Sequence, residues 1–385
     1  MIETQRARGD DAPRVKVLAT PEDPNPYQSL LYRQVTALGA TVAYTTGPTR
    51  SHSLNLLLAP ASLAARRLAG FNVLHIHWVF QFSLPWARRS ELARRLMEWW
   101  FRQYLRCACA LGYRVVWTAH DLLPHGRVFH DDERARLVLL DRCDLVIALS
   151  PSTARQLTAL GCTDVRVIPL GPYHDPYESP VDRAQARHRL NLQDDAFVVL
   201  HIGRIEAYKG ADLLLEAAAQ LPAESRIAVV IAGSCSDAHY RERLLSLAAS
   251  AGARARVCLE WIPDGDVAVY LRAADAAAFP FREVSNSSSI SLVQSFGLPV
   301  IIPNLENLED VSATGAIRYE PGADRLVDVL AAAADRAVDE LASMSAAARA
   351  HAASASWEQI GRDTLLAFTD VIDRPPARAR AARHH

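Results

Sequence analysis

Two positively charged side chains lie close together in a segment that could bind an anion. Arg204 and Lys209 belong to HIGRIEAYKG, residues 201–210, which follows a strand-forming run and precedes a helical pattern. The start of a helix favours negative charge, and an arginine and a lysine at this spacing suit a diphosphate. Lys209 is one of only two lysines among the 42 basic residues. The segment indicates an anion site; the alternative is a surface loop with two solvated charges.

A second polar loop precedes a helix in the same half of the chain. In PFREVSNSSSISLVQSFGLPVI, residues 280–301, a strand-forming run is followed by an amide and three hydroxyl side chains, those of Asn286, Ser287, Ser288 and Ser289. Hydroxyls and backbone N–H groups at a helix start can cradle an anion. Helix N-caps alone also select serine and asparagine, so both interpretations stay open.

Histidines gather at two predicted strand ends in the first half of the chain. In HIHW, residues 75–78, His75 and His77 lie on one face because strand side chains alternate. His120 and Asp121 lie where the strand pattern RVVWTAH, residues 114–120, ends, and His125 comes soon after. A histidine or aspartate at a strand end can exchange a proton or steady a developing charge. The alternative is a set of histidines that cap strand ends, and no zinc-ligand spacing is present.

These residues are positioned by an alternation of strand and helix patterns from residue 14 to about 350. Strand patterns occur at 15–19, 41–45, 73–77, 114–120, 145–150 and 165–170, and then at 197–203, 227–233, 257–261, 276–280 and 299–303. Longer helical patterns lie between them, and others follow at 323–351 and 357–372. Such alternation predicts α/β domains with parallel sheets covered on both faces.

A proline-rich break divides this alternation. The segment GPYHDPYESP, residues 171–180, has three prolines, and 385 residues suit two domains. We expect the following division: an N-terminal domain 1–172 that acquires a C-terminal helix 357–373, a linker 173–192, a second domain 193–352, and a disordered tail 374–385. Ligands of open parallel sheets bind at the carboxyl ends of the strands, so we expect one cleft between facing strand ends.

The composition excludes several classes of protein. A net charge of −1 with 50% hydrophobic and 22% charged residues excludes bulk disorder and a histone-like nucleic-acid binder, so no nucleic-acid partner is expected. The polar N-terminus is unlike a signal peptide, and no 18-residue uncharged apolar run occurs. Six cysteines without a CxxC pair are typical of a reduced cytoplasm. No GxGxxG or P-loop motif follows a strand, which argues against a nicotinamide dehydrogenase.

Together these motifs resemble a known family. The order GR(x4)KG, P(F/Y)R(x3)NS(G/S)S, helix and G(x)PVI resembles the nucleotide-sugar half of GT-B glycosyltransferases, closest to glycosyltransferase family four. NPYQSLLY at 25–32, HIHW, and VVWTAHDLLPH at 115–125 are similar to segments of bacterial transferases that build surface polysaccharides. The resemblance covers residues 14 to 372. It implies the GT-B fold: two Rossmann-like, doubly wound parallel-sheet domains facing each other across a cleft.

The resemblance also implies an activity and its residues. A hexose would pass from a nucleotide diphosphate sugar, UDP- or GDP-linked, to a hydroxyl of a glycan, glycolipid or other acceptor, with no metal and no other cofactor. By the motifs, Ile262 would lie near the nucleobase, Asn25 and Tyr27 on the acceptor side, and His77, His120 and Asp121 at the reacting centre. The donor diphosphate and sugar would contact Gly203, Arg204, Lys209, Glu283, Asn286, Ser287, Ser288 and Ser289.

One departure from the family pattern leaves the mechanism open. The family's E(x7)E carboxylates correspond to Val284 and Leu292, with Glu283 beside the first position. If the reaction inverts configuration, Asp121 or His120 would serve as the base; if it retains configuration, the donor phosphate would take the proton and His77 would be a stabiliser. Two alternatives are a sugar-nucleotide epimerase of the same fold and a catalytically degenerate sugar-nucleotide-binding subunit.

A basic, aromatic segment lies at residues 84–106. It combines two glutamates with six arginines and with the aromatic residues Trp86, Trp99, Trp100 and Phe101. A basic amphipathic helix of this kind predicts contact with the anionic inner face of a membrane, which would suit a lipid-linked acceptor. The alternative is a helix with its aromatic residues in the core and its arginines in water. We expect a cytoplasmic protein, with this peripheral contact as an open question.

Overall fold

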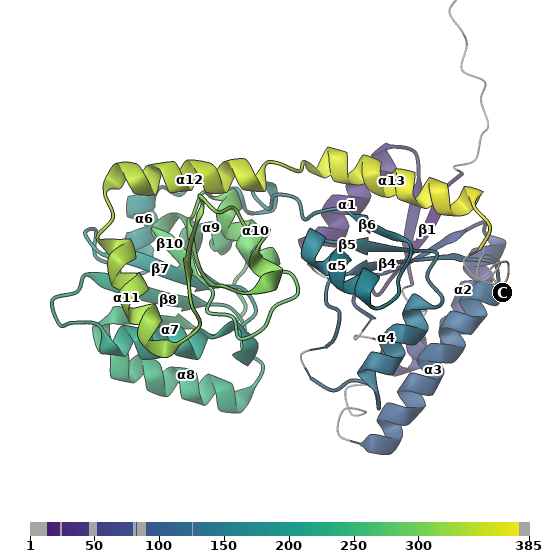
Figure 1. Cartoon of the computed structure of the whole chain (residues 1–385), viewed down its shortest axis with the longest axis horizontal. Helices are drawn as coiled ribbons and strands as arrows, with labels where there is room; N and C mark the ends of the chain where they lie inside the picture. The colour runs from purple at the N-terminus through teal and green to yellow at the C-terminus, as the bar shows by residue number, and fades with distance from the viewer. Residues whose placement is uncertain are drawn as a thin grey trace, which may run out of the picture. The chain divides into compact units, whose positions relative to one another are not determined.

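The computed structural model describes residues 14–23, 25–45, 52–79, 82, 90–124 and 126–376, and the statements below concern these residues. The chain forms two compact units (Figure 1). Unit 1 comprises Met1–Leu149, Ala154–Ile168 and Trp357–His385; unit 2 comprises Ser150–Thr153 and Pro169–Ser356. None of the described helices has the length and apolar character needed to cross a membrane.

Unit 1 is built on a parallel sheet with the order β2-β1-β3-β4-β5-β6. Its strands are β1 Lys16–Thr20, β2 Thr41–Tyr44, β3 Val73–Ile76, β4 Arg114–Ala119, β5 Leu145–Ala148 and β6 Val165–Val167. The central strands β3, β4 and β5 are buried almost throughout, as expected for a sheet that is covered on both faces. This burial explains their nearly continuous apolar sequences.

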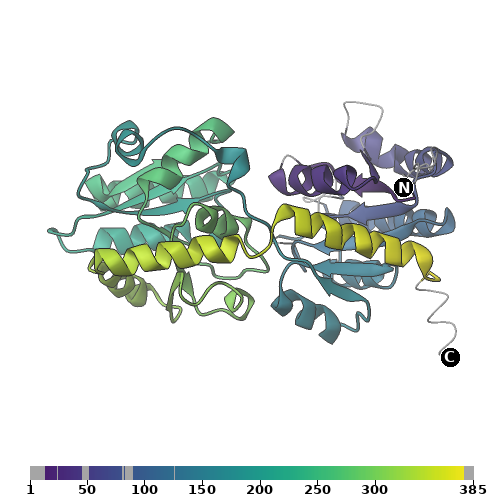
Figure 2. The same ribbon diagram turned by 90° about the horizontal axis from the view of Figure 1, so that it is seen from above.

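Helices cover both faces of this sheet (Figure 1). The helices α2 (His52–Leu68), α3 (Glu91–Ala110), α4 (Asp132–Leu140) and α5 (Pro151–Ala159) contribute to one apolar core. On the other face, α1 (Pro26–Ala37) and α13 (Trp357–Asp373) run side by side (Figure 2). Gly361 permits this approach, because an added Cβ would lie 2.4 Å from the Cβ of Gln34. The last helix therefore completes unit 1.

Unit 2 has a second parallel sheet with the order β12-β11-β10-β7-β8-β9. Its strands are β7 Phe197–Ile202, β8 Ile227–Ala232, β9 Ala255–Cys258, β10 Ala276–Ala278, β11 Val300–Pro303 and β12 Ala316–Tyr319. One face is covered by α7 (Ala211–Gln220), α8 (Ala238–Ala251) and α11 (Ala323–Ala334). The other is covered by α9 (Asp264–Ala273) and α10 (Ser288–Ser295), with α6 (Arg183–Arg189) against α9 and α12 (Val338–Ala352) against α10.

The predicted α/β class with two parallel, Rossmann-like sheets is confirmed, and three local features differ from the sequence patterns. The segment 173–192 contains α6 rather than only a connection, because the buried Arg187 pairs with Asp275 at 2.7 Å. The helical pattern 323–351 forms two helices that separate after Ala334. The strand β12 has no counterpart among the predicted strands, since AIRY is short and follows a polar stretch.

Candidate active site

Both segments that the sequence predicts to bind an anion follow strands at the point where the unit 2 sheet reverses its order. The chain runs from β7 to β8 and β9 on one side, and then adds β10, β11 and β12 on the other. Open α/β sheets bind ligands outside the carboxyl ends of the strands at such a reversal. Here these ends are those of β7 and β10, which lead into residues 203–210 and 279–287.

Gly203, Lys209 and Ser289 converge at this reversal, and we call them the β7–β10 cluster. Gly203 has a φ of +120°, and an added Cβ would lie 2.5 Å from Ser289 Oγ and 3.6 Å from Lys209 Nζ. A residue without a side chain is therefore needed for the backbone to approach the serine hydroxyl so closely, whereas the distance to the lysine is that of an ordinary contact. Ser289 thus meets two residues that lie 80 and 86 positions before it in the chain.

The loop after β7 is held against the loop after β10. The 3-10 turn Ala207–Lys209 ends at Gly210, which has a φ of +74° and lies so close to Pro280 that an added Cβ would be 2.0 Å from its carbonyl oxygen. Arg282 donates hydrogen bonds to the Ala207 carbonyl oxygen at 2.5 Å and to both carboxylate oxygens of Asp212 at 2.9 and 2.8 Å. These contacts fix the position of the turn that carries Lys209.

Arg282 and Asp212 belong to the site's support, and the sequence patterns assigned neither a role. The Asp212 carboxylate is buried and also accepts a hydrogen bond from the Tyr240 hydroxyl at 2.9 Å. Burial raises the pKa of Asp212, but hydrogen bonds from Arg282 and Tyr240 outweigh burial and hold this pKa below its usual value. The arginine in the P(F/Y)R motif was the available signal for this pair.

The remaining residues predicted to contact the sugar donor differ in their burial and in their contacts. Ser287 is the N-cap of α10, accepting a hydrogen bond from Ile290 N at 3.3 Å, so the capping interpretation holds for this serine. Ser288 begins the helix, Asn286 is partly buried, and Glu283 is exposed. Arg204 is largely exposed and pairs with Glu206 at 3.2 Å. An exposed ion pair is weak, so an anionic ligand can compete for this arginine.

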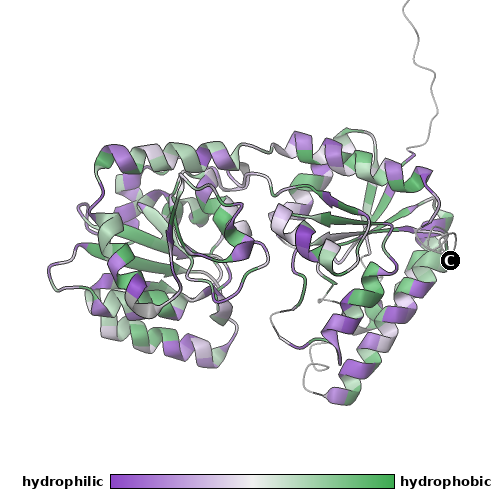
Figure 3. Ribbon diagram, in the orientation of Figure 1, coloured by the Kyte–Doolittle hydropathy of each residue, from purple (hydrophilic) through white to green (hydrophobic). Residues whose placement is uncertain are grey.

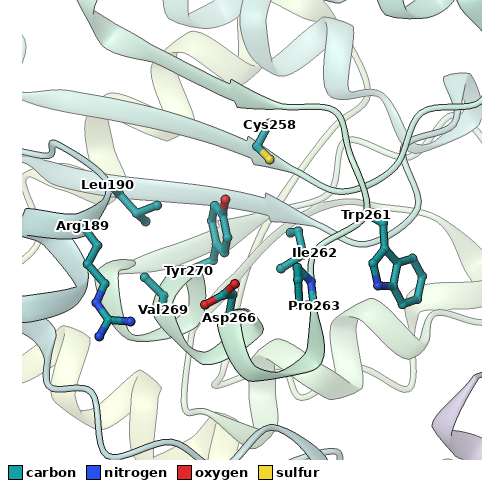
Figure 4. A pocket seen from close by; sticks show the side chains of 9 residues that line it. All are labelled: Arg189, Leu190, Cys258, Trp261, Ile262, Pro263, Asp266, Val269 and Tyr270. Carbon is teal, nitrogen blue, oxygen red and sulfur yellow. The ribbon is translucent and has the colours of Figure 1, made fainter.

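Ile262 lies in the loop that follows β9, at the rim of a cavity of about 190 Å³ (Figure 4). The cavity is lined mainly by apolar side chains from α6, β9 and α9, including Leu190, Val269 and Tyr270. The neighbouring Trp261 is 68% exposed. The predicted nucleobase residue therefore lies by the edge strand of the sheet rather than in the β7–β10 cluster.

The sheet of unit 1 has its own reversal, between β1 and β3. Asn25 caps the helix that follows β1, accepting a hydrogen bond from Tyr27 N at 2.9 Å. His77 follows β3, and His120 follows the adjacent strand β4. The ring nitrogens His77 Nδ1 and His120 Nε2 are 3.1 Å apart. The predicted acceptor-side and reacting-centre residues therefore meet at one edge of this sheet.

Aromatic rings enclose these two histidines. Trp78 stacks on His120 with a centroid distance of 4.3 Å and an interplanar angle of 15°. Tyr27 meets His120, His77 and Trp357 edge to face, at 4.8, 5.8 and 5.6 Å. Tyr27 is buried, and Asp121 is partly buried beside His120. His125 lies outside the described residues.

Burial controls the protonation of the histidines. It lowers the pKa of His75 to about 3 and that of His120 to about 4, and it holds the pKa of His77 well below its usual value. The charges of Asp121 and Asp23 oppose this effect at His120. The three imidazoles are therefore neutral near pH 7, and they can act as hydrogen-bond donors or acceptors but carry no charge.

Carboxylates that could suggest a metal lie elsewhere. Asp264 and Asp266 form an Asp-Gly-Asp triplet in the first turn of α9, where acidic residues stabilise the helix. Within the described parts of the chain, no three His, Cys, Asp or Glu side chains are grouped so that they could hold a metal ion.

Two glycosyltransferase family models match this chain, one in each half. The Glycosyltransferase Family 4 model matches residues 3–172, and that of Glycosyl transferases group 1 matches residues 182–351. A D-inositol 3-phosphate glycosyltransferase of Nocardia farcinica is 32% identical over 338 residues, 80% of this chain and 68% of that relative. One of Geodermatophilus obscurus is 29% identical over 335 residues, 81% and 69% of the two chains.

Solved structures share the arrangement of both sheets. Sucrose-phosphate synthase of Thermosynechococcus elongatus has a TM-score of 0.71 at 20% identity, with 93% of this chain and 98% of that one covered. HepE of Anabaena, solved with UDP, has a TM-score of 0.69 at 17% identity, with 92% and 99% covered. The chain therefore belongs to the family 4, group 1 glycosyltransferases and has their GT-B fold.

Proposed function

We propose that this glycosyltransferase moves a hexose from a UDP- or GDP-sugar to a hydroxyl of a glycan, a glycolipid or another small acceptor. The observation that carries the proposal is the β7–β10 cluster, where a lysine, a serine hydroxyl and a glycine backbone meet at the sheet reversal of unit 2. The structures of HepE with UDP and with UDP-glucose support a nucleotide sugar as donor. Relatives named for D-inositol 3-phosphate support a small polyol among the acceptors to test.

Lys209 would supply a point charge to the donor diphosphate, while Ser289 and the first backbone N–H groups of α10 would donate hydrogen bonds. Arg204 would leave Glu206 and add its guanidinium. When the bond to the anomeric carbon breaks, negative charge grows on the diphosphate, and fixed cations and dipoles stabilise it without reorganisation. The residues thus suit a reaction that needs no divalent metal.

The acceptor would bind to unit 1 near Tyr27, His120 and Asp121. Asp121 is a carboxylate beside neutral imidazoles, so it can take a proton from an acceptor hydroxyl if the reaction inverts configuration. In a retaining reaction the donor phosphate would take that proton. Analysis of the product anomer by NMR distinguishes the two.

Lys209→Met tests the donor assignment. Loss of a charge-assisted hydrogen bond to phosphate costs about 2 kcal/mol, so UDP and GDP should bind at least about tenfold more weakly in isothermal titration calorimetry. Arg204→Ala should weaken binding by a smaller factor. The matched control is Arg226→Ala, an exposed arginine of the same unit that pairs with Asp195 at 3.6 Å and lies before β8. Unchanged nucleotide binding by Lys209→Met would contradict the donor site.

Incubation with UDP- and GDP-sugars separates this function from its two alternatives. A transferase gives a glycosylated acceptor from a panel that includes inositol phosphates, simple glycans and glycolipids. Isomerised sugar nucleotide in the absence of any acceptor would instead identify an epimerase. Tight nucleotide binding without transfer or hydrolysis over the whole panel would identify a degenerate binding subunit.

We further propose that α2 and α3, which pack on each other, contact an anionic membrane surface at the cytoplasmic side. Among the described residues, seven of the fourteen exposed large apolar side chains lie on these two helices: Leu54, Leu57, Leu58, Leu68, Leu92, Leu96 and Trp99. The helices carry six arginines and two glutamates, and Glu98 is buried. Figure 3 shows apolar and polar residues alternating along α3. Apolar side chains flanked by arginines favour an interface with anionic lipid.

Vesicle flotation tests the membrane contact. The wild-type protein should float with phosphatidylglycerol/phosphatidylcholine vesicles but not with phosphatidylcholine alone, and salt should weaken this binding. Leu92→Asp combined with Leu96→Asp should abolish it. The control is Leu245→Asp, a change of a leucine on α8 of unit 2 that is 50% exposed, close to the 51% of Leu96. Absence of wild-type flotation, or equal loss in the control, would refute the contact.

A further inference from the structure

Five polar side chains of unit 1 form one hydrogen-bonded chain, which we call the imidazole chain. It runs in the order Thr118, His75, Tyr32, His77 and His120. Thr118 Oγ1 lies 2.7 Å from His75 Nε2, and the Tyr32 hydroxyl lies 2.7 Å from both His75 Nδ1 and His77 Nε2. His77 Nδ1 and His120 Nε2 complete it at 3.1 Å. Both ring nitrogens of His75 and both of His77 are therefore used within the chain.

Counting protons leaves two arrangements of this chain. A neutral imidazole has one N–H donor and one acceptor nitrogen, and a tyrosine has one O–H. Because Tyr32 lies between two imidazoles, it must donate to one and accept from the other. A neutral imidazole that accepts a hydrogen bond at one nitrogen donates from the other, so each ring continues the same direction of donation. In every hydrogen bond of the chain the proton is consequently donated either toward His120 or toward Thr118.

The Thr118 end favours the first direction. Tyr27 is 2% exposed, and among the described residues its side chain interacts with that of Thr118. A buried O–H group that donates to nothing is costly, and the arrangement that satisfies both hydroxyls is the one in which Tyr27 donates to Thr118. Thr118 is then left to donate its own proton to His75 Nε2. Every following link points toward His120.

The His120 end agrees with this direction. His120 then accepts at Nε2 and carries its proton on Nδ1, the nitrogen that takes no part in the chain. The negative charges of Asp23 and Asp121 both act on the His120 ring. Carboxylates only accept hydrogen bonds, so their field favours an N–H on the side of the ring outside the chain.

We propose that Tyr32 is a positioning residue that fixes the Nδ1–H tautomer of His75, His77 and His120, so that His120 presents a hydrogen-bond donor at the reacting centre. The functional part of this inference rests on the proposed function, which places His120 there. His77 then acts only through His120, because both of its ring nitrogens are engaged. A His120 that donates from Nδ1 is not the base, which leaves Asp121 to accept a proton in an inverting reaction.

Long-range ¹H–¹⁵N correlation spectra of the full chain with ¹⁵N-labelled histidine test the tautomers near pH 7. The proposal expects the protonated nitrogen to be Nδ1 in His75, His77 and His120, with assignments from single His→Gln variants. An Nε2–H tautomer at any of these three positions in the wild-type protein would overturn it. This readout does not depend on activity.

Tyr32→Phe tests the positioning role. Its loss of the hydroxyl should give mixed tautomers at His77 and His120 and lower kcat about tenfold, with KM and UDP binding unchanged. The matched control is Tyr113→Phe, which removes a buried hydroxyl that donates to the Leu63 carbonyl oxygen at 2.9 Å, outside the imidazole chain. Wild-type tautomers in Tyr32→Phe would overturn the proposal, and so would a kcat loss of equal size in the control.

A second variant covers the case in which Tyr32→Phe does not fold. Tyr27→Phe removes the donor at the start of the chain and should increase the Nε2–H form of His120; unchanged tautomers would overturn the proposed direction. If the tautomers respond as expected while no donor and acceptor pair supports transfer, then the proposed function fails and the imidazole chain stands. The two failures are therefore distinguishable.

Discussion

At the scale of single residues, the site in unit 2 depends on a pair that does not itself belong to the β7–β10 cluster. Arg282 makes two hydrogen bonds to the buried Asp212 and a third to Ala207. Ala207 is the first residue of the turn that ends at Lys209. Asp212 in turn lies in the first turn of α7, the helix that follows Gly210. The pair therefore connects the loops after β7 and β10, and the position of the lysine follows from it.

Arg282→Met should both destabilise unit 2 and weaken nucleotide binding. Removing charged donors from a buried carboxylate costs about 2 to 3 kcal/mol in the free energy of unfolding, measured by urea denaturation. The control is Arg243→Ala, because Arg243 makes one contact with the same carboxylate, at 3.0 Å, where Arg282 makes two hydrogen bonds, so its loss should cost less than about 1 kcal/mol. Equal costs for the two variants would show that Arg282 has no special role.

At the scale of elements, glycines allow the loops at the carboxyl edge of the unit 2 sheet to pack directly on one another. Gly210 lies against Pro280, and Gly233 lies so close to Gly203 that an added Cβ would be 1.8 Å from its carbonyl oxygen. Backbone groups rather than side chains fill this space. Such close packing brings the helix starts and the strand ends within reach of one ligand.

Gly210→Ala should disturb this packing far more than its backbone angle alone requires. The left-handed conformation costs a non-glycine residue about 1 to 2 kcal/mol, and the contact with Pro280 requires the loop to move as well. Gly252→Ala is the matched control, because Gly252 has a φ of +61° with no atom within 4 Å of an added Cβ. Only Gly210→Ala should lose UDP affinity in calorimetry, and equal UDP affinity in both variants would contradict the role of the close contact.

At the scale of the whole molecule, both units place candidate functional residues after the first strand of their sheet and after the strand that reverses the order. In unit 1 these strands are β1 and β3, and in unit 2 they are β7 and β10. Both units also bury neutral imidazoles: His75 and His77 in unit 1, and His201 in unit 2. The pKa of His201 is lowered to about 4 by burial.

These buried imidazoles predict a loss of stability in mild acid. Their pKa values in the folded protein lie below the ordinary value of 6.5, so between pH 6.5 and about 4 the unfolded chain binds more protons. The free energy of unfolding therefore has its full value above pH 6.5. It falls as the pH drops below 6.5, by up to about 1.4 kcal/mol per pH unit for each such histidine. Urea denaturation at pH 7, 6 and 5 measures this slope, and a flat midpoint would contradict it.

The sequence by itself determined the two parallel sheets, the segments at 201–210 and 280–301, and the histidines at strand ends, because periodicity, glycine and helix-start residues act locally. The tertiary structure decided which of these side chains meet. Tyr32 reaches His75 and His77 over 43 and 45 positions, and Arg282 reaches Asp212 over 70. Such partners depend on strand order and on helix packing across the sheet, which no local pattern contains. For the same reason, the sequence identified His77 as a candidate, but only the fold showed that both of its ring nitrogens are engaged.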